Sequence, residues 1–327
     1  MPEATGNSDF VVGVDLGGTK IQAGIYDARL SLLGSAKVST KAERGVGDVL
    51  DRVARCVQDA VDECNLGLKQ VRAVGIGAPG AVDSGEGRVI FAPNLGWKNV
   101  PLRTELEKRL DLPVFVENDC NLCALGVHVH ELGGKPRHMI GLFIGTGIGA
   151  GLILNGELYT GHSHSAGEVG HMVILAGGPA CACGNNGCFE AMASRTAIIK
   201  RIAAGLKDGE KTVLTETLGE NLKDLRSGDL RRAIRRGDKF VAKVVEEAAN
   251  YIGLAVGNLI NIYSPEVVML GGGVIEALEQ EVMPTITRAA LAHVLPGTNK
   301  GVEITASKLA DNAGIVGGAV LAWRGAK

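Results

Sequence analysis

The chain has 327 residues, a formal net charge of −2 and a hydrophobic fraction of 46%, which is enough for one large domain or two ordinary ones. This near-neutral charge argues against nucleic acid as the main partner. No apolar run reaches the roughly 18–20 residues that a membrane-spanning helix needs, and the polar N-terminus lacks the regions of a signal peptide. We therefore expect a cytoplasmic protein that works without a membrane.

The first third of the chain alternates between strand and helix patterns. Apolar residues at alternate positions predict strands at 10–16 and 21–27, joined by a glycine turn, with a further strand near 32–39. Helical spacing predicts helices at about 46–64 and 101–110. Buried strands are expected at 71–80 and 113–119, and a loop connects the first of these to the motif at 93–97.

The strand–turn–strand pattern then occurs a second time. Residues 139–158 resemble residues 11–30, with Gly13 opposite Gly141, Gly17 opposite Gly145 and Leu30 opposite Leu158. A unit repeated in both halves of the chain suggests two related α/β lobes with a cleft between them. A long buried helix is expected at 240–262 and a last helix at about 311–325.

Three cysteines fall within the stretch CACGNNGCFE at 181–190. Disulfides are rare in the cytoplasm, whereas thiolates on a short glycine-bearing loop suit a structural zinc ion, which takes four Cys or His ligands. His171 is the nearest candidate for the fourth ligand, with His162 and His164 as competitors. Three incidental or buried thiols are the alternative.

Three glycine-rich segments could approach a ligand closely. GTGIGAG at 145–151 and the turn in VDLGGTK are each followed by a strand, so neither matches a dinucleotide fingerprint or a P-loop. Successive N–H groups in such turns can nevertheless bind phosphate, although plain hairpins are the alternative. The glycines at 271–273 follow a buried strand and suggest another close approach.

Taken together, these motifs resemble the ROK family of repressors and sugar kinases, within the hexokinase/actin-like superfamily. The resemblance covers nearly the whole chain through the motifs DLGGTK (15–20), GAPG (77–80), PNLGW (93–97), ENDCN (117–121), IGTGIGAG (144–151), GEVGH (167–171), CACGNNGCFE (181–190) and LGGGV (270–274). It implies a two-lobed, hexokinase/actin-like (ribonuclease H-like) α/β fold with duplicated lobes and a central cleft. The small lobe would comprise residues 1–118 together with the C-terminal helix at 311–327, and the large lobe residues 119–310.

The resemblance also implies roles for individual residues. Asp119 would be the catalytic base, although an Asp before a helix is often simply an N-cap. ATP with Mg²⁺ would be bound by Asp15, Gly17, Gly18, Thr19, Lys20, Gly145, Thr146, Gly147, Gly271 and Gly272. The sugar would be contacted by Asn94, Asn118, Asp119, Glu168, His171 and Glu190. One structural zinc would be held by His171, Cys181, Cys183 and Cys188.

The activity implied is phosphorylation of glucose at its 6-hydroxyl by ATP. The alternatives are kinases for fructose, mannose, N-acetylmannosamine or N-acetylglucosamine, a polyphosphate donor, or a sugar-sensing regulator without activity. Only about ten residues precede the first strand, so we do not expect the N-terminal helix-turn-helix of the regulators. The resemblance also implies a homodimer, although no feature of the sequence specifies one.

Overall fold

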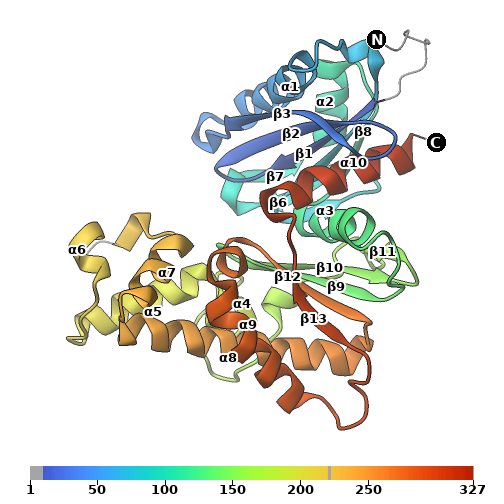
Figure 1. Cartoon of the computed structure of the whole chain (residues 1–327). Coiled ribbons are helices and arrows are strands. Elements are labelled where there is room, and N and C mark those ends of the chain that lie inside the picture. Colours follow the sequence, from blue (N-terminus) through green and yellow to red (C-terminus); the bar gives the residue numbers. More distant parts are fainter. Residues whose placement is uncertain (1–9, 220–221, 327) are drawn as a thin grey trace. The chain divides into compact units, whose positions relative to one another are not determined.

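The first sheet is formed by β1 (Phe10–Leu16), β2 (Lys20–Tyr26), β3 (Leu32–Ser39), β4 (Val71–Ala78) and β8 (Val114–Asn118). In the computed structural model, which describes residues 10–219 and 222–326, the strand order is β3-β2-β1-β4-β8 (Figure 1). The first three strands form an antiparallel meander, and β1, β4 and β8 run parallel. The predicted hairpin and buried strands are confirmed.

Helices cover both faces of this sheet. α1 (Val46–Asp62) and α2 (Leu102–Leu110) pack on one face, and α10 (Ala313–Gly325) packs on the other (Figure 1). In α1 the buried residues Val49, Val53 and Val57 recur every four positions, so one stripe of the helix faces the sheet. These three helices confirm the predictions at 46–64, 101–110 and 311–325.

α10 approaches the sheet at backbone distance. A Cβ atom added to Gly13 on β1 would lie 1.7 Å from the carbonyl oxygen of Ile315, and one added to Gly75 on β4 would lie 2.0 Å from that of Gly318. Gly13 and Gly75 are paired in register. Two neighbouring strands therefore lack side chains where the helix lies across them, which lets α10 pack closer than larger residues would allow.

A small antiparallel sheet is inserted between β4 and β8. It consists of β5 (Ala81–Asp83), β6 (Arg88–Ala92) and β7 (Trp97–Val100), in the order β5-β6-β7, with the short 3₁₀ turn η3 (Pro93–Leu95) before β7. The sequence analysis expected a loop here. Strands of three to five residues are too short for alternation to stand out from the turns around them.

The second sheet repeats the topology of the first. Its strands are β9 (Met139–Ile144), β10 (Ile148–Leu154), β11 (Glu157–Tyr159), β12 (Val267–Gly271) and β13 (Glu303–Ala306), in the order β11-β10-β9-β12-β13. β10 and β11 are antiparallel, and β9, β12 and β13 run parallel. The repeat inferred from the glycine pattern is therefore confirmed, with β9 in the place of β1.

The remaining helices are α3 (Asp119–Gly126), which continues into the π-helix η4 (Val127–Glu131), then α4 (Phe189–Ala193), α5 (Arg195–Lys207), α6 (Leu214–Leu218), α7 (Ser227–Arg235), α8 (Lys239–Tyr263) and α9 (Gly273–His293). α8 confirms the long buried helix and packs closely on α9. A Cβ atom added to Gly253 of α8 would lie 2.6 Å from the carbonyl oxygen of Ile286. No helix in residues 10–219 and 222–326 is long and apolar enough to cross a membrane.

The chain divides into two compact units, but not at the expected boundary. Of the described residues, the first unit contains those up to Lys135, Gly151–Gly167 and those from Asp311 on, and the second contains those in Pro136–Ala150 and Glu168–Ala310. We expected the first part to end at residue 118. It extends further because α3 packs through Leu122 and Leu125 against Val320 of α10.

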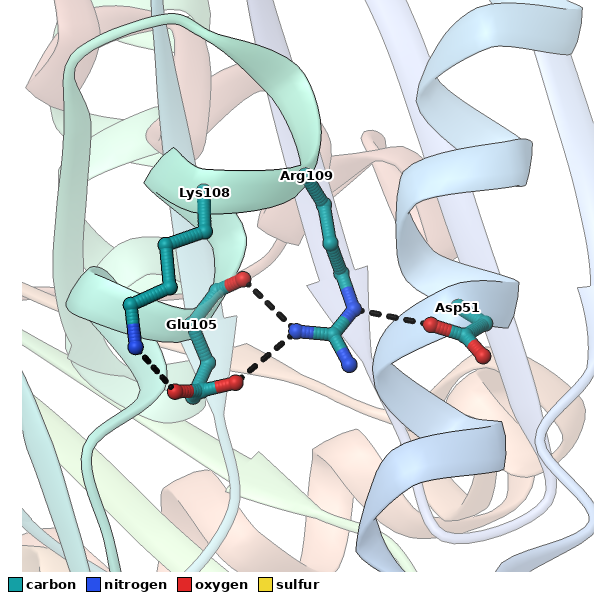
Figure 2. Close-up of polar contacts among 4 residues, drawn as sticks. All are labelled: Asp51, Glu105, Lys108 and Arg109. Atoms are coloured by element: carbon teal, nitrogen blue, oxygen red, sulfur yellow. Dashed lines mark hydrogen bonds and ion pairs between the residues drawn. The ribbon is translucent and has the colours of Figure 1, made fainter.

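A polar network joins α1 to α2 at the surface of the first unit (Figure 2). Arg109 of α2 donates from Nε to Asp51 Oδ1 of α1 at 2.8 Å, and from Nη1 to Glu105 Oε2 at 2.9 Å. Lys108 also donates to Glu105, at 2.9 Å. Such exposed pairs contribute little stability, so α2 is held mainly by its buried residues Leu102, Leu106 and Leu110.

The close packing of α10 gives a first prediction. Gly13→Ala should destabilise the protein by about 2 kcal/mol or more, because its new Cβ meets backbone that cannot move without displacing α10. Gly47→Ala in α1 is the matched control, because nothing lies within 4 Å of its added Cβ. That change should be neutral or slightly stabilising, since alanine favours a helix. Chemical denaturation measures both, and equal effects would contradict the packing argument.

Candidate active site

Asp15 and the first glycine turn lie where β1 connects to β2. The turn is closed by the Gly17 N–H, which donates to the Lys20 carbonyl at 2.9 Å. Thr40, which follows β3, supports it twice: its hydroxyl donates to the Gly17 carbonyl at 2.6 Å and its N–H donates to the Thr19 carbonyl at 2.9 Å. The predicted phosphate-binding segment is thus held in one conformation by the neighbouring strand.

Gly18 brings this turn against another predicted site residue. A Cβ atom added there would lie 3.2 Å from the Cβ of Asn94, a predicted sugar contact on η3. Gly17 and Gly18 are not among the described residues with positive φ. Close approach, rather than a left-handed backbone, is therefore the reason for a glycine at position 18.

The carboxyl group of Asp15 titrates far from its usual range. Burial is the main cause that raises its pKa from 3.8 to about 7, with a further rise from the charge of Asp119. Lys20 lowers the pKa and Asp311 raises it again. Lys20 is itself paired with Asp311, 2.5 Å from Nζ to Oδ2, so much of its charge is already compensated.

Asp119 is the first residue of α3, directly after β8. The N-cap is Asn118, whose Oδ1 accepts from the N–H groups of Cys120 at 2.9 Å and Asn121 at 3.1 Å. The alternative that Asp119 serves as the N-cap is therefore wrong. Instead, Asp119 Oδ1 accepts from the Cys120 N–H at 2.8 Å, which orients its carboxylate.

Capping also limits what Asn118 can offer to a sugar. Its Oδ1 accepts two backbone N–H groups, and its Nδ2 donates to the Gly80 carbonyl at 3.1 Å. An amide has two acceptor positions and two N–H donors. The predicted sugar contact would thus be confined to the second N–H of the amide.

Gly77 of β4 lies between the two aspartates in the sheet. It pairs in register with Asp15 of β1, and its added Cβ would lie 3.2 Å from the Cα of Asp119. The carboxyl ends of β1, β4 and β8 therefore bring Asp15 and Asp119 together with no intervening side chain.

The second glycine turn, between β9 and β10, is attached to the start of α5. The Gly145 N–H donates to the Gly147 carbonyl at 2.9 Å, and the Arg195 N–H donates to the Gly145 carbonyl at 2.9 Å. Arg195 also donates from Nη2 to the Thr146 hydroxyl at 2.6 Å. A guanidinium group beside this turn adds the positive charge that a phosphate would require, and the sequence analysis did not identify it.

Glu168, His171 and Glu190 form a polar group beside the second turn. The Ile148 N–H donates to Glu190 Oε2 at 2.9 Å, and a Cβ added to Gly147 would lie 2.4 Å from the same oxygen. Burial raises the pKa of Glu168, His171 lowers it and Glu190 raises it. These three predicted sugar contacts therefore interact electrostatically with one another.

His171 also contributes to a cluster with Cys181, Cys183 and Cys188, whose ligand atoms all lie within 4.8 Å of one another. Cys183 Sγ is 3.6 Å from Cys188 Sγ, and Cys181 Sγ is 3.8 Å from His171 Nδ1. Tetrahedral zinc with bonds of about 2.3 Å to sulfur would set two thiolates about 3.8 Å apart. The donor set and spacing therefore fit zinc, with His171 rather than His162 or His164 as the fourth ligand.

Backbone bonds shape the loop that carries the cysteines. The Cys181 N–H donates to the Asn185 carbonyl at 2.8 Å, and the Phe189 N–H donates to the Met172 carbonyl at 2.8 Å. Whereas His171 Nδ1 is the ring nitrogen near Cys181, its Nε2 lies 4.0 Å from Glu168 Oε2. One imidazole thus connects the cluster to the predicted sugar contacts.

The third glycine segment joins β12 to α9. Gly272 has a φ of +85° and is the N-cap of α9, and its added Cβ would lie 2.7 Å from the Ile144 carbonyl oxygen. Nothing lies within 4 Å of a Cβ added to Gly273. Backbone geometry accounts for Gly272, whereas the space beside Gly273 is open.

The pKa of Asp15 gives a second prediction. Because the folded-state pKa of about 7 lies above 3.8, ionised Asp15 lowers stability as the pH rises between these values. Without nucleotide, Asp15→Asn should raise the melting temperature at pH 8 by roughly 2–6 °C, and this gain should shrink at pH 5. Calorimetry at both pH values measures it, with the exposed Asp208→Asn as control. A gain equal at both pH values would contradict the assignment.

Comparison with known proteins identifies the family. The family model described as the ROK family matches residues 11–324. The glucokinase of Thermotoga maritima is 36% identical over 310 residues, covering 94% of this chain and 96% of that protein. The xylose repressor of Caldicellulosiruptor bescii is 32% identical over 265 residues, covering 80% of this chain and 65% of the repressor.

Among solved structures, the ROK family glucokinase from Streptomyces griseus, in complex with glucose and AMPPNP, has a TM-score of 0.84 and 32% identity. The match covers 96% of this chain and 99% of that one. The expected fold is thereby confirmed. Because the family model and these relatives match almost the whole chain, the protein belongs to the ROK family and has the actin-like α/β fold of its sugar kinases.

Proposed function

We propose that the protein transfers the γ-phosphoryl group of ATP to the 6-hydroxyl of glucose. The observation that carries this proposal is the meeting of Asp15 and Asp119 at the carboxyl ends of parallel strands, beside a glycine turn. Phosphoryl transfer needs a carboxylate to orient the attacking hydroxyl, and charge compensation around the phosphates. Asp119 would perform the first task, and Asp15 would contribute to the second by binding Mg²⁺.

In the proposed reaction Asp119 orients the sugar hydroxyl and accepts its proton as the oxygen attacks the γ-phosphorus and ADP leaves. The Cys120 N–H, which donates to Asp119 Oδ1, keeps the carboxylate oriented. Asp15 would bind the Mg²⁺ that accompanies the nucleotide, and this ion would compensate the negative charge of the phosphates. N–H groups of the two glycine turns, Lys20 and Thr146 bind the phosphates, and Gly271 and Gly272 contact adenosine.

The sugar is recognised by the polar group of Glu168, His171 and Glu190 together with Asn94 and the second amide N–H of Asn118. Carboxylates and an imidazole are suitable partners for ring hydroxyls, and a wrong sugar would leave some of them unpaired. Zinc, when bound to the Cys/His cluster, supplies rigidity rather than Lewis acidity, because the four protein ligands fill its coordination. His171 then keeps a fixed orientation toward Glu168.

Glucose as the acceptor is supported by the names of the curated relatives, which include glucokinases at 32–36% identity over almost the whole chain. Another hexose or an N-acetylhexosamine would use the same mechanism, and so would polyphosphate as donor. The similarity to xylose repressors favours a second candidate, a sugar-binding regulator without turnover. Activity on a panel of sugars separates these candidates.

Asp119→Asn tests the proposed base. The amide cannot accept the proton, so kcat with glucose should fall by about 10²–10⁴-fold while the fold is retained. ADP release with MgATP is measured against hexoses and N-acetylhexosamines, with Asp208→Asn as the control. Full activity of Asp119→Asn would rule out this base. Absence of turnover with every sugar and either donor, in a folded wild-type protein that binds sugar, would favour the regulator.

The zinc proposal is tested by metal content. Wild-type protein should contain about one equivalent of zinc by mass spectrometry of the metal, because the cluster has one set of four ligands. Cys188→Ser should lose most of it and raise the KM for glucose more than that for ATP. Cys64→Ser, in the first unit, is the matched control. A Cys188→Ser protein with full zinc content would contradict the assignment.

A further inference from the structure

The sequence made His164 a candidate zinc ligand, but its side chain instead contacts the turn between β5 and β6. It lies on segment 160–166, between β11 and Glu168, and has a left-handed backbone with a φ of +54°. The segment is closed by the Ala166 N–H, which donates to the Thr160 carbonyl at 2.9 Å. Residues other than glycine are uncommon in this conformation, although histidine, like Asn and Asp, adopts it more often than most. The backbone alone therefore assigns no role to His164, and its side-chain contacts must do so.

The imidazole reaches a turn of the small sheet. His164 Nδ1 lies 3.3 Å from the hydroxyl of Ser84 and 3.5 Å from that of Thr160, within hydrogen-bonding reach of both. A Cβ added to Gly85 would lie 3.5 Å from His164 Nε2, so the ring also packs on the turn. His164 therefore connects segment 160–166 to the β5–β6 turn, and all of these residues belong to the first unit.

The β5–β6 turn is itself fixed by Arg103 of α2. The guanidinium donates to the Ser84 carbonyl at 2.8 Å and to the Gly85 carbonyl at 2.9 Å, and the Arg103 N–H donates to the Gly87 carbonyl at 2.9 Å. The same side chain donates from Nε to the Val114 carbonyl of β8 at 3.2 Å. His164 thus attaches its segment to a turn that is held by a helix and by the strand leading to Asp119.

Both partners of this contact lead directly to sugar contacts. The small sheet carries Asn94 on η3, and segment 160–166 is followed at once by Glu168 and His171. We propose that His164 is a positioning residue for the sugar site. It holds segment 160–166, which leads into Glu168 and His171, against the β5–β6 turn. The inference rests on the proposed function, since it assigns sugar to these residues.

The expected effect is on sugar affinity and not on chemistry. If the segment is not attached, sugar binding must order it, and this conformational cost weakens binding by about three- to tenfold. None of the hydrogen bonds described above joins His164 to Asp119 or to a residue proposed to bind phosphate. The KM for ATP and kcat should therefore change less than twofold.

The test compares His164→Ala with His164→Asn, Ser84→Ala and the double variant His164→Ala/Ser84→Ala. His162→Ala is the matched control, because His162 is an exposed histidine on the same segment. Glucose binding by calorimetry without ATP is measured with kcat, both KM values and the melting temperature. We expect weaker glucose binding in His164→Ala and Ser84→Ala, no additional loss in the double variant, and recovery in His164→Asn, whose amide suits both the φ and the hydrogen bond.

Other outcomes overturn the inference. Unchanged glucose binding in His164→Ala, additive losses in the double variant, or an equal loss in His162→Ala would each contradict the positioning role. A fall in kcat or melting temperature without a change in glucose affinity would assign His164 to general stability. If wild-type protein binds glucose without turning it over, the kinase proposal fails while the binding series still decides the role of His164. If wild-type protein binds no sugar of the panel, both proposals fail.

Discussion

The packing of α10 directly on the backbone of β1 and β4 is the constraint on which the first half of the site depends. Gly13 and Gly75 allow it, and Gly318 supplies the facing backbone of the helix. Because the helix lies so close, its first turn reaches the end of β1, where a Cβ on Gly314 would lie 3.1 Å from the Cβ of Asp15. The burial that raises the pKa of Asp15 is thus a consequence of how the last helix packs on the first strand.

The two sheets share a topology, yet their glycine turns are fixed by different neighbours. In the first sheet Thr40 holds the turn and Gly18 meets Asn94. In the second, Arg195 holds the turn and Gly147 meets Glu190. Duplication therefore explains why two turns of this kind exist, whereas residues outside the repeated unit determine which polar group each turn approaches.

Patterns that are local in sequence predicted much of this structure, and contacts between distant segments account for the rest. Strand alternation, the repeat and the long helix α8 are local, and the cysteine spacing brought three ligands onto one loop. The capping by Asn118 was missed because ENDCN offers two neighbouring candidates, and only the backbone decides between them. The unit boundary and the Lys20–Asp311 pair depend on the packing of the C-terminal helix α10 against the first sheet. No local pattern specifies this contact between distant segments.

Each unit gathers acidic groups that oppose one another's ionisation in the protein alone. In the first unit Asp119 and Asp311 both raise the pKa of Asp15, and Lys20 opposes them only in part. In the second, burial and the adjacent thiols Cys183 and Cys181 raise the pKa of Cys188 to about 12. A divalent cation would relieve either cluster, and the ligand types separate the two ions. Carboxylates suit Mg²⁺, and thiolates with an imidazole suit Zn²⁺. In the first unit a Mg²⁺ ion that arrives and leaves with the nucleotide would allow the carboxylates to ionise. In the second, a permanently bound Zn²⁺ ion would do the same for the thiols.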